Sequence, residues 1–174
     1  MINKNGDTIA SAVTNLDLHD IARAAKTYGV RSFYVATPLI DQKKLVEKIV
    51  THWTTGTGAH YNPKRCEALS LIKIKDSLAE VKDDIAKEGF GYPETVVTSA
   101  KQSSHSIDFN KFRKKLKGDS PYLLVFGTAW GLSGEIVKNA DFLLAPVEGG
   151  TGYNHLSVRS AVAIILDRLI GIGL

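Results

Sequence analysis

Residues 121 to 171 read PYLLVFGTAWGLSGEIVKNADFLLAPVEGGTGYNHLSVRSAVAIILDRLIG. Two short apolar runs, Tyr122 to Phe126 and Phe142 to Ala145, each end in a Gly-rich loop that leads into a predicted helix. These runs are long enough for buried strands and too short for stable helices. The carboxyl ends of parallel strands meet at one edge of a sheet, so both loops are expected where α/β folds bind ligands.

The predicted C-terminal helix, from about Leu156 to Leu169, is apolar around most of its circumference. We therefore expect its own sheet and another subunit to bury it. Arg159 lies near the start of this helix, where a guanidinium is seldom placed for packing alone. It either reaches solvent or a carboxylate, or it faces the site.

The rest of the chain alternates between strand and helix patterns. Before Pro121, strands are expected at 8–14, 31–36, 69–74 and 95–98, and helices at 18–28, 42–53, 77–88 and 109–117. Asp17 is a candidate cap for the first helix, and residues 54–65 are expected to be a long irregular loop. The order predicts one α/β domain over residues 1–174, with a mostly parallel sheet and helices on both faces.

Composition limits the class of protein. The chain has 174 residues, a net charge of +4 and an isoelectric point near 9.1, which permits a nucleic-acid partner without requiring one. Its apolar runs are too short to span a membrane and its start has no hydrophobic signal region, so we expect a cytoplasmic protein. One cysteine, Cys66, and five scattered histidines indicate no metal site.

Several common site signatures are missing from the sequence. There is no phosphate-binding G-x-x-x-x-G-K-[ST], and Gly127 and Gly131 lack the spacing of a dinucleotide fingerprint. No serine lies in a G-x-S-x-G elbow. Dinucleotide enzymes and hydrolases are therefore disfavoured.

Three segments together resemble a known family. Residues 126–133, FGTAWGLS, look like the F-G-x-E-x-x-G-L-S segment of the SPOUT superfamily of RNA methyltransferases. Residues 153–163 are similar to the segment that opens their last helix, and residues 17–30 to their N-x-G-x-x-x-R segment. The likeness is greatest to a bacterial RNA methyltransferase domain found alone or fused behind a tRNA guanosine-N1 methyltransferase, whose G-G-x-x-Y-N-H-L-S-V-R-S-A run is matched at 149–161.

The resemblance implies a deep C-terminal trefoil knot from Pro121 onward and a homodimer built on it. It also implies S-adenosylmethionine held among three loops whose glycines allow close backbone approach. The alternative is that these glycines serve only as tight turns. The cofactor-binding candidates are Thr98, Ser99, Ala100, Phe126, Gly127, Thr128, Gly131, Leu132, Ala145, Pro146, Val147, Gly149, Gly150, Asn154, His155 and Leu156.

The catalytic candidates are Arg23, His19, Tyr153 and Arg159. Arg23 falls on the arginine that ribose methyltransferases of this superfamily use at the acceptor hydroxyl. Since a guanidinium almost never gives up its proton, we expect positioning and stabilisation of a developing alkoxide; a surface ion pair is the alternative.

Three departures from the family pattern leave the acceptor atom open. Asp17 and Ser157 stand where relatives carry Asn, and Ala129 stands where many carry Glu.

RNA contacts are expected at Tyr61, Lys64 and Arg65, beside the Gly-rich loop, because aromatic and cationic side chains bind unpaired nucleotides. The basic run 111–117 is a second candidate, or only a solvated helix face.

Two functions remain from the sequence alone. The first is an S-adenosylmethionine-dependent RNA methyltransferase that acts on tRNA, with ribose 2′-O slightly ahead of a base nitrogen. The second is a catalytically silent cofactor-binding dimer that serves as an interaction module for RNA or a partner modification enzyme.

Overall fold

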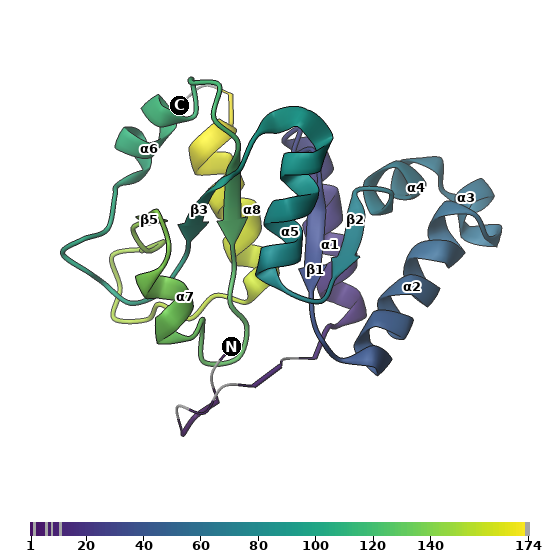
Figure 1. Cartoon of the computed structure of the whole chain (residues 1–174), viewed down its shortest axis with the longest axis horizontal. Helices are drawn as coiled ribbons and strands as arrows, with labels where there is room; N and C mark the ends of the chain where they lie inside the picture. The colour runs from purple at the N-terminus through teal and green to yellow at the C-terminus, as the bar shows by residue number, and fades with distance from the viewer. Residues whose placement is uncertain (2, 6, 8, 11, 173–174) are drawn as a thin grey trace. The chain divides into compact units, whose positions relative to one another are not determined.

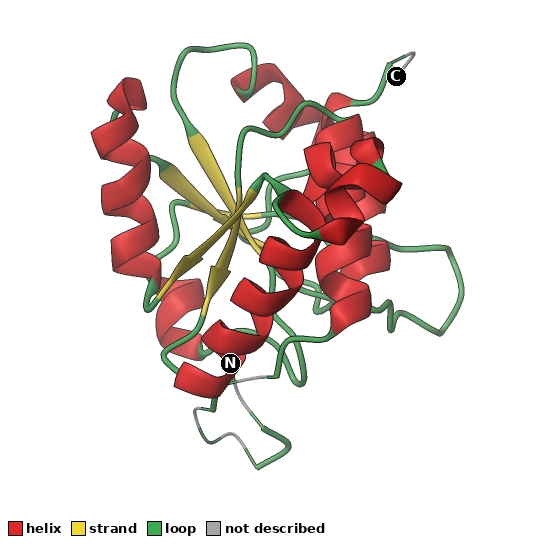
Figure 2. Ribbon diagram, turned by 90° about the vertical axis from the view of Figure 1, so that its right-hand side faces the viewer, coloured by secondary structure: helices red, strands yellow, loops and turns green. Residues whose placement is uncertain are grey.

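The structure is a computed structural model that describes residues 1, 3–5, 7, 9–10 and 12–172 (Figure 1). The chain folds into two compact units. The N-terminal unit is Ala10–Val81, and the C-terminal unit is Lys82–Leu174 together with Met1–Ile9. The elements, drawn by type in Figure 2, alternate between helix and strand along much of the chain.

The N-terminal unit is built on two parallel strands. Phe33 pairs with Ile72 and Ala36 with Lys75, and the helices between the strands make the crossover that parallel pairing requires. Its core is formed by buried side chains of α1, α2, α4 and both strands, among them Leu18, Val46 and Leu69. The elements are α1 Asn15–Thr27, β1 Phe33–Ala36, α2 Ile40–Thr54, α3 Thr57–Tyr61, α4 Pro63–Leu69 and β2 Ile72–Lys75.

Three local predictions for the first 65 residues are wrong. Residues 9, 10 and 12–14 are not in a strand, while positions 8 and 11 of that predicted strand lie outside the described residues. The α1 cap is Thr14, which accepts a hydrogen bond from the Asp17 backbone at 3.2 Å, so Asp17 is not the cap. The expected loop 54–65 contains α3 and the start of α4, because Asn62 caps α4 and Pro63 suits its first turn.

The C-terminal unit holds a three-stranded parallel sheet in the order β4-β3-β5. Val96 of the central strand pairs with Leu124 on one side and Phe142 on the other. The chain enters this unit through α5 Leu78–Ile85, which a short π-helical turn, Ala86–Phe90, extends. The following elements are β3 Glu94–Val97, α6 Phe109–Lys115, β4 Tyr122–Val125, α7 Gly134–Lys138, β5 Phe142–Leu143 and α8 Val158–Ile170.

The core of the C-terminal unit joins its sheet to α6 and α8. Phe112 is fully buried, with its ring 5.2 Å from that of Tyr122 and 5.6 Å from that of Phe142. Ile165 and Leu169 of α8 pack into the same cluster, so the helix buries one face within its own unit. Ile170 remains 41% exposed. Burial of α8 by a second subunit stays a prediction.

The parallel α/β class predicted from the sequence is confirmed, since every strand pair in the described part of the chain is parallel. The pairs form a two-stranded and a three-stranded sheet rather than the one sheet expected. The single domain, the knot and the homodimer stay predictions. Across the described residues, no helix has the length and apolar character that a membrane crossing requires.

Candidate functional site

Three loops meet at the carboxyl edge of the β4-β3-β5 sheet, because each follows one of its strands. The backbone nitrogen and Oγ1 of Thr98 both donate to the Val125 carbonyl at 3.1 Å. These bonds tie the loop that follows β3 to the end of β4. Asn154 Nδ2 donates to the Ala100 carbonyl at 3.1 Å, which ties the loop that follows β5, here the third loop, to the loop that follows β3. The structure thus brings together the segments predicted to hold the cofactor.

The middle loop, residues 126–133, turns tightly on itself. A Cβ atom at Gly127 would lie 2.9 Å from the Leu132 backbone nitrogen, so this position requires glycine. Gly131 has φ +105, and Ala129 has φ +52, which is uncommon for a residue with a side chain. Backbone of this kind is concentrated at ligand-binding sites, where surrounding structure holds it in place.

Thr128 gives the clearest indication that a polar ligand fits this loop. Its Oγ1 is buried and has no hydrogen-bond partner among the described residues. Its backbone N–H donates to the Met1 sulfur at 3.4 Å. A buried hydroxyl without a partner is destabilising, and a polar ligand group would satisfy it. The residues present therefore fit S-adenosylmethionine, which offers both polar groups and an apolar surface.

The third loop, residues 144–157, combines buried and exposed parts. Pro146 is buried and Val147 packs against the core of the unit, which gives the loop an apolar base. Beyond them the loop is open, and Tyr153 is 74% exposed with its ring 6.4 Å from that of His155.

Ser157 closes the third loop by capping α8 through the Ser160 backbone at 3.4 Å. A serine there supplies the cap that asparagine would supply, so this departure keeps the start of α8 intact. Arg159 follows in the first turn of α8 and is half-buried.

His19 and Arg23 lie on one face of α1, in the N-terminal unit. Burial lowers the pKa of His19 below its ordinary value, and the nearby Arg65 charge lowers it further, while Asp20 opposes both. The neutral imidazole is therefore favoured near neutral pH. His19 Nδ1 is buried and has no partner among the described residues. Arg23 is exposed and also lowers the pKa of His19.

One of the predicted RNA-binding side chains, Arg65, lies beside this α1 face. The Arg65 guanidinium stacks 4.4 Å from the centre of the Trp53 ring, and His19 meets the same ring edge-on at 5.5 Å. Lys64 pairs with Glu67 at 2.9 Å, and its side chain is 87% exposed. Tyr61 is 86% exposed. Two of the catalytic candidates, His19 and Arg23, thus lie in the same unit as the predicted RNA contacts, and Arg65 is close to His19.

Sequence reasoning missed two aromatic members of this cluster, Trp53 and His52. They appeared only as the end of an apolar helix. Their position directly before the Gly-rich segment that begins at Gly56 could have indicated a role in the site, since glycine allows a close approach to a bulky ring.

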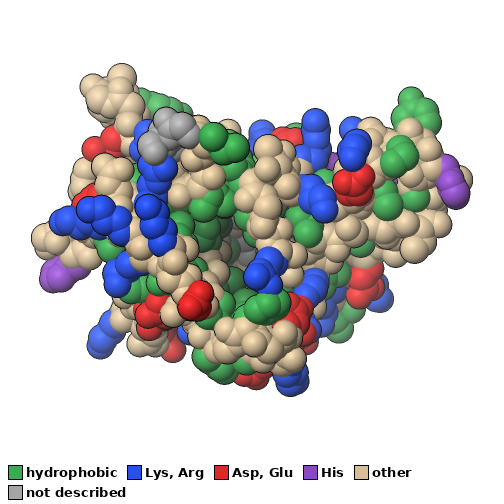
Figure 3. Space-filling view, turned by 90° about the horizontal axis from the view of Figure 1, so that it is seen from above, with side chains coloured by type: hydrophobic (Ala, Val, Ile, Leu, Met, Phe, Trp, Pro, Cys, Tyr) green, Lys and Arg blue, Asp and Glu red, His purple; other side chains and the backbone are tan. Residues whose placement is uncertain are grey.

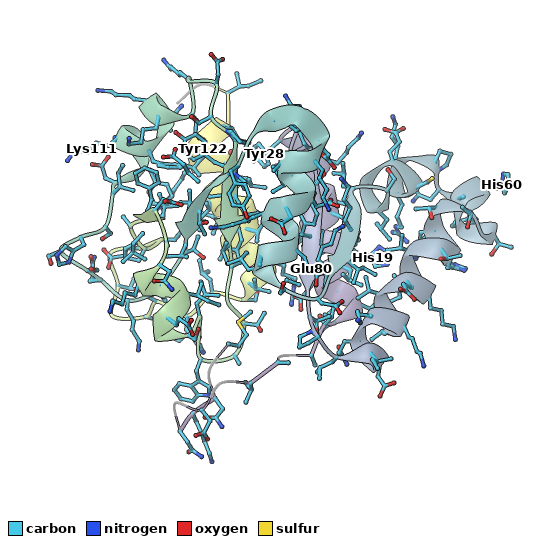
Figure 4. The ribbon with its side chains drawn as sticks, viewed as in Figure 1. His19, Tyr28, His60, Glu80, Lys111 and Tyr122 are labelled. Atoms are coloured by element: carbon cyan, nitrogen blue, oxygen red, sulfur yellow. The ribbon has the colours of Figure 1, made fainter. Side chains whose placement is uncertain are left out.

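The second basic candidate, α6, carries Arg113, Lys114 and Lys115 in its last turn. Lys and Arg side chains gather at the left of Figure 3, the side on which α6 lies in Figure 1. Lys115 lies 4.8 Å from the centre of the Phe142 ring. Lys111, labelled in Figure 4, pairs with the capping Asp108 at 3.5 Å. Its backbone hydrogen bond to Asp108 is the main cause that lowers the pKa of that carboxyl.

Comparison with known proteins identifies the family. Residues 1–171 match the family described as SAM-dependent RNA methyltransferase. A tRNA (guanine-N(1)-)-methyltransferase of Nitratidesulfovibrio vulgaris is 44% identical over 168 residues, which cover 97% of this chain and 39% of that protein. An uncharacterised Aquifex aeolicus protein is 37% identical over 169 residues, covering 97% of this chain and 82% of that protein. The chain spans about two fifths of the length of the curated methyltransferases it matches.

Solved structures agree on the fold. The SpoU methyltransferase AviRb of Streptomyces viridochromogenes, determined with AdoMet, has a TM-score of 0.54 and 20% identity, covering 95% of this chain and 62% of its own. The chain belongs to the SAM-dependent RNA methyltransferase family and has the SPOUT fold, as the three sequence segments predicted. S-adenosylmethionine is the cofactor of this class of enzyme.

Proposed function

We propose that this chain methylates tRNA and that its acceptor is a ribose 2′-oxygen, ahead of a base nitrogen. The relative named as a tRNA methyltransferase supports the choice of tRNA. The observation that supports a ribose acceptor is made on one face of α1. There the exposed Arg23 guanidinium lies beside His19, whose pKa is lowered. A cation positions a phosphate or ribose and stabilises a developing alkoxide, while a neutral imidazole is able to accept a proton.

The three-loop junction of the C-terminal unit would hold the cofactor, whose sulfonium supplies an activated methyl group. Gly127 and Gly131 allow backbone donors and acceptors to approach a ligand closely. The Thr128 hydroxyl is available to hydrogen-bond it, and Phe126 and Leu132 supply apolar contact that excludes water. Tyr153, which is exposed, and Arg159 are the catalytic candidates that this unit contains.

The protein's task is then mainly positioning, because the donor is already activated. Arg23 would orient the acceptor nucleotide through its phosphate or ribose. His19 would take up the proton that the acceptor loses, in its neutral form near pH 7. If the acceptor is a base nitrogen, His19 and Tyr153 rather than Arg23 become the main catalytic candidates.

The test is transfer of radiolabelled methyl from S-adenosylmethionine to unmodified bulk tRNA, followed by digestion to nucleosides. A labelled 2′-O-methyl nucleoside is the expected product. A labelled base would overturn the ribose acceptor and keep the enzyme, whereas no label with cofactor binding intact would favour the silent interaction module.

Arg23→Ala and Arg23→Lys make the matched pair for the role of Arg23. We expect Arg23→Ala to lower kcat/KM by about 10²- to 10³-fold, as loss of one transition-state donor does, with cofactor affinity unchanged. Arg23→Lys keeps the charge without the planar fork and should recover part of the activity. Equal activity of Arg23→Ala and wild type would leave Arg23 as a surface ion-pair residue.

A further inference from the structure

We propose that the junction of α2 and α3 is a stacking pocket for one unpaired nucleobase of the RNA substrate. This inference rests on the proposed function, because it takes RNA as the substrate. A shallow pocket of about 270 Å³ lies there, lined by His52, Trp53, Thr57, Gly58 and Tyr61. Its volume is below the ~300–1,000 Å³ of pockets that hold drug-sized ligands, which suits a single base.

Two glycines make the pocket possible by bringing α3 close to the end of α2. A Cβ atom at Gly58 would lie 2.7 Å from Cε3 of Trp53 and 2.9 Å from the His52 carbonyl. A Cβ atom at Gly56 would lie 2.8 Å from that same carbonyl. A larger residue at Gly58 would push α3 away from the indole, and one at Gly56 would push it away from the His52 carbonyl, so both glycines serve a packing function beyond turn formation.

The Trp53 ring is held in a fixed orientation. The rings of His19 and His52 both meet it edge-on, at centroid distances of 5.5 Å and 5.1 Å and interplanar angles of 89°. The Arg65 guanidinium stacks 4.4 Å from its centre. A ring fixed in this way loses little conformational entropy when a ligand binds, which favours affinity.

Tyr61 gives the pocket an aromatic side chain that no neighbour covers extensively. It is 86% exposed, although it is a large aromatic residue on a short helix. Exposed aromatic side chains beside cations are typical of single-stranded nucleic-acid sites, where successive bases stack on aromatic rings. His60, labelled in Figure 4, is also exposed on α3, and it is a further ring for an adjacent base.

The surrounding charge matches a nucleotide rather than a neutral ligand. Lys64 and Arg65 begin α4 directly after the pocket helix, and Arg23 lies close enough to His19 to lower its pKa. These cations are suited to the phosphates that flank a bound base. Thr57 and His52 add polar groups to the lining, which could hydrogen-bond a base edge. A base inside a double helix is stacked and paired, so the pocket selects an unpaired nucleotide.

The test measures binding of a fluorescein-labelled single-stranded 12-mer of adenylates and of a 12-base-pair RNA duplex, without cofactor. We expect wild type to bind the single strand more tightly than the duplex. Tyr61→Ala should weaken single-strand binding by roughly 5- to 150-fold, which corresponds to the stacking contribution of one base, and should leave duplex binding within twofold. Tyr61→Phe should stay within twofold of wild type because it keeps the ring.

Tyr92→Ala is the matched control, since Tyr92 is another exposed tyrosine, at 62%, and does not line the pocket. Tyr61→Ala should melt at the wild-type temperature because its ring is largely exposed. Equal single-strand affinity of Tyr61→Ala and wild type, or an equal loss for strand and duplex, would overturn the pocket. If that result accompanies normal methylation of tRNA, the proposed function stands; if it accompanies no methyl transfer to tRNA, both proposals fail.

Discussion

Thr128 and His19 each bury a polar side-chain atom that has no hydrogen-bond partner among the described residues. Most buried polar atoms in folded proteins are paired, so each of these atoms needs an explanation. Thr128 lies in a loop with positive φ at Ala129 and Gly131, and His19 lies against Trp53 and Arg65. Both positions are predicted site residues, and unpaired groups at such positions are available to a ligand or substrate.

Replacement of Thr128 by valine separates the ligand role of its hydroxyl from a structural one. Thr128→Val removes an unpartnered buried hydroxyl at nearly constant volume, so the free energy of unfolding should stay equal or rise. The dissociation constant for S-adenosylmethionine should increase by about 2- to 13-fold, the value of one ordinary hydrogen bond. Calorimetric titration and thermal melting measure the two effects. An unchanged dissociation constant would remove Thr128 from the cofactor site.

His19 makes stability depend on pH in a defined direction. Its pKa is lowered in the folded protein by burial and by Arg65, with Arg23 adding to this effect and Asp20 opposing it. The unfolded chain therefore binds more protons than the folded one just below pH 6.5. The contribution of His19 is complete above about pH 6.5 and declines as the pH falls below it.

The measurement compares wild type with His19→Gln by urea unfolding at pH 8 and pH 5. The stability advantage of wild type over the variant should be smaller at pH 5. An equal advantage at both values would show that His19 titrates alike in the folded and unfolded chain.

At the scale of elements, short helices position the aromatic and cationic side chains of the N-terminal unit. Asn62 is decisive here, because its Oδ1 accepts from the Arg65 backbone at 3.0 Å and its backbone carbonyl accepts from the same nitrogen at 3.1 Å. It ends α3 and starts α4 at one residue. The cap therefore sets the angle between Tyr61 and Arg65.

Loss of this cap should affect stability and RNA binding together. Asn62→Ala should lower the free energy of unfolding by about 0.5–2 kcal/mol, whereas Asn62→Asp keeps a capping oxygen and should stay close to wild type. Single-strand RNA affinity should fall in the alanine variant because Tyr61 and Arg65 lose their fixed relation. Denaturant unfolding and fluorescence anisotropy measure the two quantities. Full RNA affinity in Asn62→Ala would show that the cap does not position the contacts.

At the scale of the whole molecule, the net charge of +4 gives a mild attraction for RNA, and the arrangement of cations decides where it acts. Two basic regions compete for this role, the start of α4 and the last turn of α6. In α4, Arg65 is packed on an aromatic ring beside an exposed tyrosine. In α6, Lys115 lies over the ring of Phe142, and Lys111 pairs with Asp108, the residue that caps the helix. The first arrangement is the better suited to RNA.

Salt dependence distinguishes the two regions. The double variant Lys64→Gln with Arg65→Gln should weaken RNA binding and reduce the slope of log K against log salt by about 1.4, if both cations contact phosphates of a single strand. The variant Lys114→Gln with Lys117→Gln, which changes one lysine of α6 and one just after it, is the matched control and should keep the slope. Cofactor affinity should be unchanged in both. A reduced slope only in the α6 variant would place the RNA contact there.

Much of the fold followed from local patterns. The apolar runs at 122–126 and 142–145 form β4 and β5, and the Gly-rich segments after them form loops at one sheet edge, as expected. The secondary-structure predictions were wrong where a segment's residues are compatible with more than one kind of structure. The run at 8–14 has strand composition, yet Val13 donates to the Gln42 side chain at 2.7 Å and Thr14 caps α1. The Gly- and Thr-rich segment 54–65 folds into helix because Asn62 and Pro63 form a start signal that the surrounding glycines obscured.

The sequence by itself determined the parallel α/β class, the family and the three loops expected to hold the cofactor, since periodicity, turn residues and motifs are local properties of the chain. Only the tertiary structure decided that Thr128 buries a hydroxyl with no partner in the described part of the chain, and that His19, Trp53 and Arg65 form one cluster. These properties depend on packing between residues far apart in the chain. Burial, pairing and pKa are set by such neighbours, and no spacing in the sequence specifies them.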